Sequence, residues 1–272
     1  MTVDKAAEAG YSSIYLLHGM KRSGNHGLVR WLLPQIDGSF INNAIPVGPI
    51  LRGVKKLPDP MPFDAWIKGK TGLRGHGRAG LLIGMEDLEL KVTPLASDGI
   101  GVHKLLILRR PEQMFSSRLR HASRVEMVAF PCQNNDVMRR AVSVWKQHAR
   151  CFLGMDNTYP GRIAISFEAW VTDREYRRAL CDAIGIDFDD RAFGGVGHEG
   201  GGSSFDGMSF DGKGHLMNIL DRVSQLMPGE RAVLDDIFRD PELQRLSELV
   251  HSADPYRHLR MASHNTPSLQ SP

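Results

Sequence analysis

The chain has 272 residues, of which 42% are hydrophobic, and a formal net charge of +3. This composition is typical of a globular protein and excludes a disordered one, and the length suits one large α/β domain. No stretch approaches the roughly 20 consecutive apolar residues that a transmembrane helix needs, and the N-terminus lacks an apolar signal core. We therefore expect a cytoplasmic protein without a membrane span, and the mild charge predicts no nucleic-acid partner.

Neither the cysteines nor the histidines are spaced as metal ligands. The three cysteines are far apart and form no C-x-x-C pair, and the eleven histidines show no H-x-x-x-H spacing. We expect no metal site and no disulfide framework, with the cysteines as small core residues.

The basic residues are concentrated in one segment. Residues 52–80 hold seven Lys or Arg against two acidic residues. This segment belongs to a longer proline-rich stretch, 34–79, whose lack of periodicity predicts a loop insertion. A basic cluster of this kind suits the binding of an anionic or carbohydrate substrate, and the alternative is a solvated surface.

Apolar runs that alternate with helical periodicity predict the fold. Strands are expected at 13–17, 80–84, 104–108 and 162–167, and helices at 27–33, 112–128, 136–155 and 173–184. Strands that alternate with helices form a parallel sheet covered on both faces. We predict a single α/β domain over residues 13–260, with terminal tails at 1–12 and 261–272.

A glycine-rich loop follows this pattern. Nine of the 22 residues from Phe193 to Gly214 are glycine, which predicts a flexible loop. Helical segments are expected after it, from His215 to about Val250.

The loop between the first strand and the first helix has the G-x-x-x-x-G skeleton of a phosphate-binding loop, from Gly19 to Gly24. Glycines let successive backbone N–H groups converge on a phosphate at the positive end of a helix. A nucleotide triphosphatase needs Lys and then Ser or Thr directly after the second glycine. Asn25 and His26 occupy those places, so the sequence departs from that class.

The cations of this loop lie inside it, at Lys21 and Arg22. An arginine there can neutralise the charge of a departing 5′-phosphate without a metal ion. The arrangement suits a nucleotide with a single 5′-phosphate.

Residues 22–26, R-S-G-N-H, resemble the 5′-phosphosulfate loop of the sulfotransferases, with Asn25 where Thr is usual. A second match follows a strand: Arg109-Arg110-Pro111, with Ser117 eight residues after Arg109, resembles the 3′-phosphate motif of the same family. Gln113 replaces its common Asp.

Two weaker matches follow in the correct order. Phe167 and Glu168 stand in the first two places of the family's Y-E-D-L segment, and Lys213-Gly214 is similar to a late K-G pair that closes over the nucleotide. In this resemblance Glu168 is a structural residue rather than a catalytic one.

The resemblance implies the P-loop-like sulfotransferase fold and an enzyme that moves a sulfuryl group from 3′-phosphoadenosine 5′-phosphosulfate (PAPS) to a hydroxyl or amine, leaving adenosine 3′,5′-bisphosphate (PAP). The implied donor-binding residues are Lys21, Arg22, Ser23, Gly24, Asn25, His26, Arg109, Ser117, Lys213 and Gly214. Arg22 would also stabilise the leaving phosphate. The acceptor is a small molecule or a glycan.

An acceptor that attacks sulfur must lose a proton, so a base is expected near the loop. Glu86 ends the second predicted strand, at the edge where parallel sheets place their active sites, and it lies 23 residues before Arg109. Asp87, His76 and His103 are its rivals.

Two other functions compete with sulfuryl transfer. A small-molecule kinase or another phosphate-loop nucleotide enzyme would need a loop Lys and a Mg²⁺ hydroxyl that this loop lacks. A non-enzymatic domain that binds a partner through residues 52–80 is the second alternative, and intact Arg22, Arg109 and Ser117 argue against it.

Overall fold

The computed structural model describes residues 11–41, 79–90, 100–125, 135–196 and 202–259. Five strands form one sheet, in the order β2-β3-β1-β4-β5, and every neighbouring pair is parallel. The strands are β1 (Ser13–Gly19), β2 (Gly38–Ile41), β3 (Gly80–Glu86), β4 (Gly101–Leu108) and β5 (Arg162–Ser166). The predicted single α/β domain with a central parallel sheet is confirmed.

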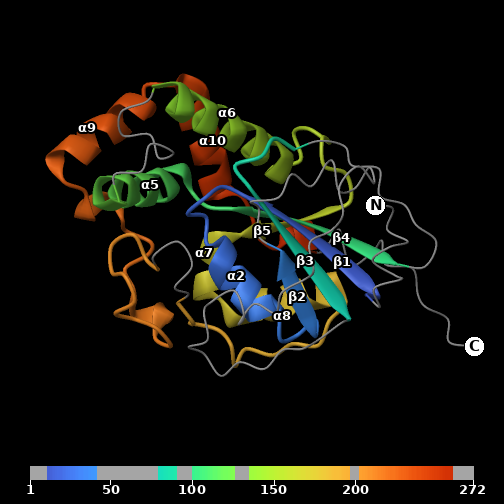
Figure 1. Ribbon diagram of the computed structural model, residues 1–272. Helices are drawn as coiled ribbons and strands as arrows, with labels where there is room; N and C mark the ends of the chain where they lie inside the picture. The colour runs from blue at the N-terminus through green and yellow to red at the C-terminus, as the bar shows by residue number, and fades with distance from the viewer. Residues whose placement is uncertain (1–10, 42–78, 91–99, 126–134, 197–201, 260–272) are drawn as a thin grey trace, which may run out of the picture.

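Helices cover both faces of this sheet (Figure 1). They are α2 (Asn25–Leu32), α5 (Pro111–Val125), α6 (Asn135–Phe152), α7 (Phe167–Thr172), α8 (Arg174–Ile184), α9 (Pro228–Ile237) and α10 (Pro241–Ser252), with two short 3₁₀ turns at Gly214–Leu216 and Val223–Gln225. Within the described chain no helix combines the length and the apolar composition that a bilayer crossing requires.

The period of two along the strands divides the core between the faces. Tyr15 and Leu17 pack with α2, α7 and α8, whereas Ile14 and Leu16 face the opposite side. On β4 the alternation continues, since Leu106 packs toward α5, α6, α9 and α10. Both faces are apolar, which is why the sheet is stable only when helices cover both.

Several element predictions need correction. Residues 38–41, expected in a loop, form β2, and residues 167–172, placed between a strand and a helix, form α7. β2 has four residues and pairs only with β3, so it is too short to show periodicity. Residues 52–78 of the basic segment lie outside the described residues.

The strand β3 extends two residues beyond its predicted end, so that Glu86 is its last residue. The expected helical stretch after residue 214 consists of 3₁₀ turns followed by α9 and α10. Cys151 and Cys181 are buried and free, as expected, and Cys132 lies outside the described residues.

Two buried histidines, one on β1 and one on α6, are uncharged. His18 of β1 and His148 of α6 meet edge to face, with ring centroids 6.2 Å apart. Burial, with a smaller contribution from His148, lowers the pKa of His18 to about 3, and burial lowers the pKa of His148 to about 4. His148 Nε2 lies 2.8 Å from the Leu88 carbonyl oxygen.

These histidines predict acid sensitivity. In the unfolded chain a histidine titrates near 6.5, so the unfolded state binds more protons than the folded state below that pH. The free energy of unfolding should be fully retained above pH 6.5 and fall as the pH drops toward 4, by at most about 2.7 kcal/mol per pH unit for two sites. Urea titrations at stepped pH measure this slope.

The variant His148→Gln removes one titrating group and keeps a side-chain donor for the Leu88 carbonyl. As the pH drops, its free energy of unfolding should fall less steeply than that of the parent, by the contribution of about one proton. A slope equal to that of the parent would mean that His148 does not contribute to the acid sensitivity.

Candidate functional site

The loop between β1 and α2 turns tightly at the carboxyl edge of the sheet. The Ser23 amide donates to the Met20 carbonyl at 3.0 Å, and Arg22 and Gly24 both have positive φ, 72° and 89°. The Ser23 hydroxyl is buried and, among the described residues, has no hydrogen-bond partner. A buried hydroxyl at the start of a helix suits a bound anion, since anions also gain from the helix dipole.

Phe167, the first residue of α7, lies between this loop and Arg109, which follows β4. A Cβ atom at Gly24 would lie 2.3 Å from the Phe167 ring, so the ring rests directly on the glycine. The guanidinium carbon of Arg109 lies 4.6 Å from the centroid of the same ring. Phe167 is thus packed between the phosphate-binding loop and Arg109.

Arg109 follows β4 and is buried at the centre of the candidate site. Its Nη1 donates to the Arg22 carbonyl at 2.9 Å and lies 3.3 Å from the Ser117 hydroxyl, while Nη2 donates to the Ile219 carbonyl at 2.6 Å. The Arg109 carbonyl accepts a bond from the Trp145 indole at 3.0 Å. The structure therefore brings Arg109, Ser117 and the predicted loop together.

Charged groups of both signs lie near the buried Arg109 guanidinium: the arginines Arg22 and Arg222 and the glutamates Glu168 and Glu112. Burial lowers the pKa of Arg109 to about 9; Glu168 opposes this effect, and the nearby cations Arg222 and Arg22 add to it. Burial raises the pKa of Glu168, which accepts a bond from the Arg110 amide at 3.0 Å. Glu168 thus shapes the end of β4, as the resemblance implies.

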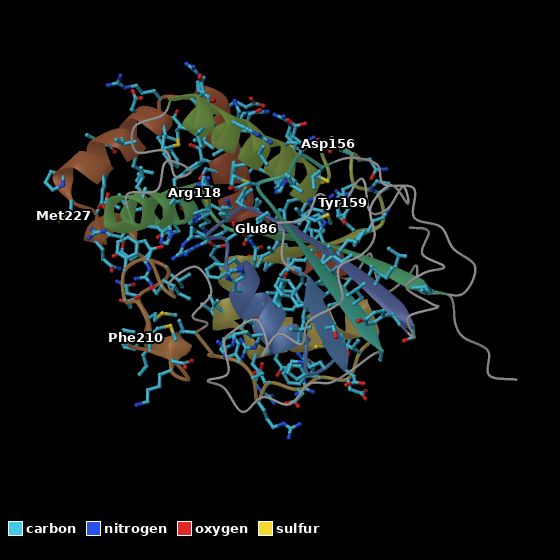
Figure 2. All side chains as sticks on the ribbon, in the orientation of Figure 1. Glu86, Arg118, Asp156, Tyr159, Phe210 and Met227 are labelled. Carbon is cyan, nitrogen blue, oxygen red and sulfur yellow. The ribbon has the colours of Figure 1, made fainter. Side chains whose placement is uncertain are left out.

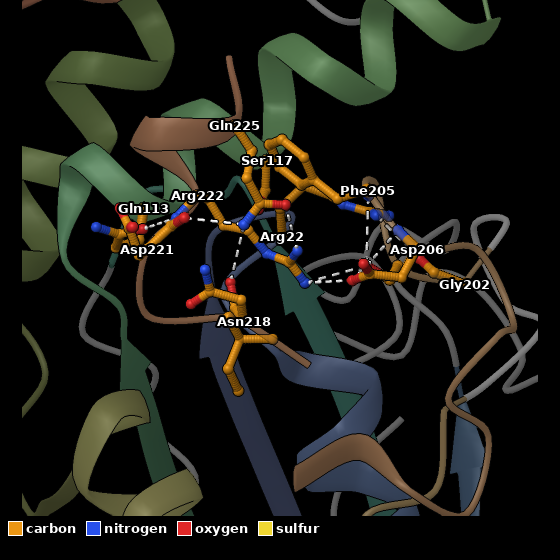
Figure 3. Close-up of polar contacts among 12 residues, drawn as sticks. Arg22, Gln113, Ser117, Gly202, Phe205, Asp206, Asn218, Asp221, Arg222 and Gln225 are labelled. Atoms are coloured by element: carbon orange, nitrogen blue, oxygen red, sulfur yellow. Dashed lines mark hydrogen bonds and ion pairs between the residues drawn. The ribbon is translucent and has the colours of Figure 1, made fainter. Parts of the chain in front are cut away.

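Arg222 is a member of this cluster that the sequence motifs did not identify. Its Nη2 lies 2.7 Å from Asp206 Oδ2 and 3.2 Å from the Ser203 hydroxyl, and its backbone N–H donates to Gln113 at 2.7 Å (Figure 3). The guanidinium carbon of Arg222 lies 4.7 Å from the centroid of the Phe205 ring. No sequence motif pointed to it, because its contacts join segments far apart in sequence.

The glycine-rich segment contacts the phosphate-binding loop at Gly202. Arg22 Nη2 donates to the Gly202 carbonyl at 2.9 Å. Lys213 is exposed, and its amide donates to Phe210, while the Gly214 amide donates to Gly194 at 2.9 Å. The described backbone contacts of Lys213 and Gly214 thus lie within residues 194–217, whereas Arg22 contacts the segment at Gly202.

Glu86 lies on the α2 side of the same edge, where it is labelled near the centre of Figure 2. Its Oε1 accepts a bond from the Asn25 amide at 2.7 Å and lies 4.0 Å from His26 Nε2. The Asn25 amide also donates to the Met20 carbonyl at 2.9 Å. A small pocket here is lined by Leu17, Asn25, His26, Val29, Phe40, Gly84, Met85 and Glu86.

The rivals of Glu86 lie elsewhere or are engaged. The ring of His103 stacks on that of Tyr15, with ring centroids 4.6 Å apart, near the amino ends of β4 and β1. Asp87 accepts bonds from Arg118 on both carboxylate oxygens, at 2.8 and 3.0 Å. His76 lies outside the described residues. Of the described candidates, Glu86 is the one that lines this pocket.

No protein-family model matches the chain, and neither does any curated protein. Among solved structures, the chain is similar to the mouse sulfotransferase SULT7A1 complexed with PAP, with 13% identity and a TM-score of 0.44 over 93% of this chain and 90% of that one. It is also similar to a sulfotransferase from Alicyclobacillus acidocaldarius, with 17% identity and a TM-score of 0.43 over 88% of this chain and 96% of that one. Both neighbours are sulfotransferases. At this level of identity, the function of this chain has to be inferred from its own contacts.

Gly24 offers a test of the packing between the loop and the start of α7. Gly24→Ala adds both left-handed strain, about 1–2 kcal/mol, and a clash with Phe167. Gly154→Ala is the matched control, because Gly154 also has a positive φ, 73°, but its added Cβ would meet nothing within 4 Å. The free energy of unfolding should fall more for Gly24→Ala than for Gly154→Ala. Equal losses in the two variants would show that the Phe167 ring moves aside without cost.

Proposed function

We propose that this protein is a sulfotransferase that moves the sulfuryl group of PAPS to a hydroxyl or amine of an acceptor. The observation that carries the proposal is the convergence of Arg109, Ser117 and the 20–24 loop. Because Arg109 bonds both the Ser117 hydroxyl and the Arg22 carbonyl, two anion-binding groups lie within reach of one side chain. Such proximity suits the 3′- and 5′-phosphates of one nucleoside bisphosphate.

In this proposal Arg109 and Ser117 bind the 3′-phosphate, and Arg222 adds a third buried cation to the same region. A guanidinium binds a phosphate with two parallel hydrogen bonds, and such charge-assisted bonds are the stronger ones. Arg109 and Arg222 are both almost fully buried, so their charge is poorly screened by water. The contacts to Ile219 and Asp206 would be exchanged, at least in part, for contacts to phosphate.

Arg22, with Lys21, Ser23, Gly24 and His26 of the same loop and first helical turn, would hold the 5′-phosphosulfate. As the acceptor oxygen or nitrogen attacks sulfur, the bond from sulfur to the bridging oxygen breaks, and PAP leaves with the electron pair. Arg22 and the loop N–H groups stabilise the negative charge that develops there. A sulfuryl group in transfer carries less negative charge than a phosphoryl group, so the reaction needs no metal clamp.

Glu86 would accept the proton of the attacking group, and Asn25 would orient it. The Asn25 amide joins Glu86 to the Met20 carbonyl, so the base is fixed relative to the loop. The pocket beside Glu86 is mostly apolar, which keeps the proton transfer away from bulk water. A carbohydrate acceptor remains part of the proposal on the strength of the basic segment 52–80.

A small-molecule kinase is less consistent with these contacts. Asn25 stands where a kinase loop of this type has its Lys, and its amide is bound to protein groups rather than directed at a phosphate.

The first test is donor identity. The protein should bind PAP in EDTA more tightly than AMP, and Arg109→Ala should weaken PAP binding by about 1.5–3 kcal/mol, the range for a hydrogen bond to a charged group. AMP affinity should stay nearly unchanged, because AMP lacks the 3′-phosphate. Isothermal calorimetry measures both.

The matched control is Lys213→Ala, which removes an exposed cation, whereas Arg222→Ala removes a buried one. PAP binding should weaken in Arg222→Ala and remain near the parent value in Lys213→Ala. The reverse result would restore the K-G pair as the nucleotide-closing segment. Equal affinity of the parent for PAP and AMP would refute the 3′-phosphate site.

The second test is the base. Glu86→Gln keeps an oxygen that can accept the Asn25 bond but cannot take a proton at neutral pH, so turnover should fall by about 10²–10⁴. PAP affinity should barely change. Release of PAP from PAPS with a panel of sugars and phenols measures the rate. If Glu86→Gln stays within threefold of the parent while His76→Asn abolishes transfer, the base is His76.

A further inference from the structure

Asp87 follows Glu86 directly but has different surroundings. It has a positive φ, 54°, and its amide donates to the Gly19 carbonyl at 3.1 Å. Its Oδ1 accepts a bond from the Lys21 backbone N–H at 3.0 Å, and Lys21 Nζ lies 4.0 Å from Oδ2. The pairing of β1 with β3 thus continues past the last residues of the strands into the phosphate-binding loop.

The second partner of Asp87 comes from the other half of the candidate site. Arg118 lies on α5, next to Ser117, and its side chain is only 2% exposed. Its Nη1 donates to both carboxylate oxygens of Asp87. One carboxylate therefore joins the loop, which would hold the 5′-phosphosulfate, to the helix that carries the 3′-phosphate hydroxyl.

We propose that Asp87 is a positioning residue that sets the loop relative to α5 through the Lys21 N–H, an inference that rests on the proposed function. Arg22 has a left-handed backbone directly after Lys21, a conformation that costs free energy unless its neighbours impose it. Anchoring the Lys21 amide on Asp87 fixes the residue before that strained position. Asp87 then acts on the donor through the loop, without touching the donor.

A buried ion pair that only stabilises the fold is the competing explanation. Removing Asp87 alone cannot distinguish the two, because it would take a carboxylate partner away from the buried Arg118 charge, which is strongly destabilising in any case. The distinction requires variants in which the ion pair is absent and only the acceptor for the Lys21 N–H differs.

Two double variants meet this requirement. Asp87→Asn with Arg118→Met retains a side-chain oxygen for the Lys21 N–H, whereas Asp87→Gly with Arg118→Met has none. Asn and Gly both tolerate a positive φ, so backbone strain is nearly matched. Both variants lack the buried guanidinium.

Two measurements on the full chain follow: the Kd for PAP by calorimetry in EDTA, and the hydrogen-exchange rate of the Lys21 amide by NMR without nucleotide. The Gly variant should bind PAP about 10- to 100-fold more weakly than the parent and exchange the Lys21 amide faster. The Asn variant should stay within about threefold of the parent Kd and keep the amide protected.

Asp190→Asn serves as the control for stability alone. Asp190 pairs with the buried Arg177 at 2.7 Å, on the α8 side of the sheet. This variant should lower the Tm and leave the Kd for PAP unchanged.

Equal Kd values and equal Lys21 exchange in the two double variants would overturn the positioning role. If the parent itself fails to bind PAP, the proposed function is wrong. The exchange rates then decide the role of Asp87 by themselves: faster exchange in the Gly variant alone supports it, and equal rates refute it.

Discussion

The candidate site depends on one buried cation. Arg109 leaves the end of β4 with its backbone carbonyl held by Trp145, and its guanidinium contacts the loop at Arg22 and the helix α5 at Ser117. A guanidinium keeps its charge when buried, so the fold has to satisfy it with carbonyl and hydroxyl oxygens. Each of the segments that supply those oxygens is thereby fixed relative to the others.

These partners do not neutralise Arg109. Carbonyl and hydroxyl oxygens accept its hydrogen bonds, and the charged groups nearby are two further arginines, Arg222 and Arg22, and two glutamates, Glu168 and Glu112. Burial is the main cause of the lowered pKa of Arg109, and repulsion from the two arginines adds to it. An anion between Arg109, Arg22 and Arg222 would relieve the repulsion and gain charge-assisted hydrogen bonds, whereas a neutral ligand would do neither. The site is thus suited to a multiply charged ligand.

Much of this could be predicted from the sequence, because it depends on local pattern. The strands β1, β3, β4 and β5 are apolar runs bounded by turns, and the loop that follows β1 shows its glycines directly. Arg109 and Ser117 are separated by eight residues across a strand end and a helix, so one motif contains both. The fold class, which is confirmed, follows from these local patterns.

The rest could not be predicted, because it depends on contacts between distant segments. Arg222 reaches the cluster through Gln113, 109 residues earlier in the chain, and no local pattern records that contact. The short strand β2 exists only because β3 offers it an edge. Lys213 satisfied the sequence pattern, and the described backbone at this K-G pair bonds within residues 194–217.

The adjacent acids Glu86 and Asp87 show why residue type and position alone did not assign the base. Glu86 is the last residue of β3, paired with Gly19, and Asp87 follows it with a left-handed backbone. Glu86 therefore meets Asn25, His26 and an apolar pocket, and Asp87 meets Arg118 and the Lys21 amide. Arg118 engages both carboxylate oxygens of Asp87, whereas Glu86 lines a pocket. In the proposal, proton transfer falls to Glu86 and loop positioning to Asp87, and the two adjacent carboxylates have different surroundings because the backbone is left-handed at Asp87.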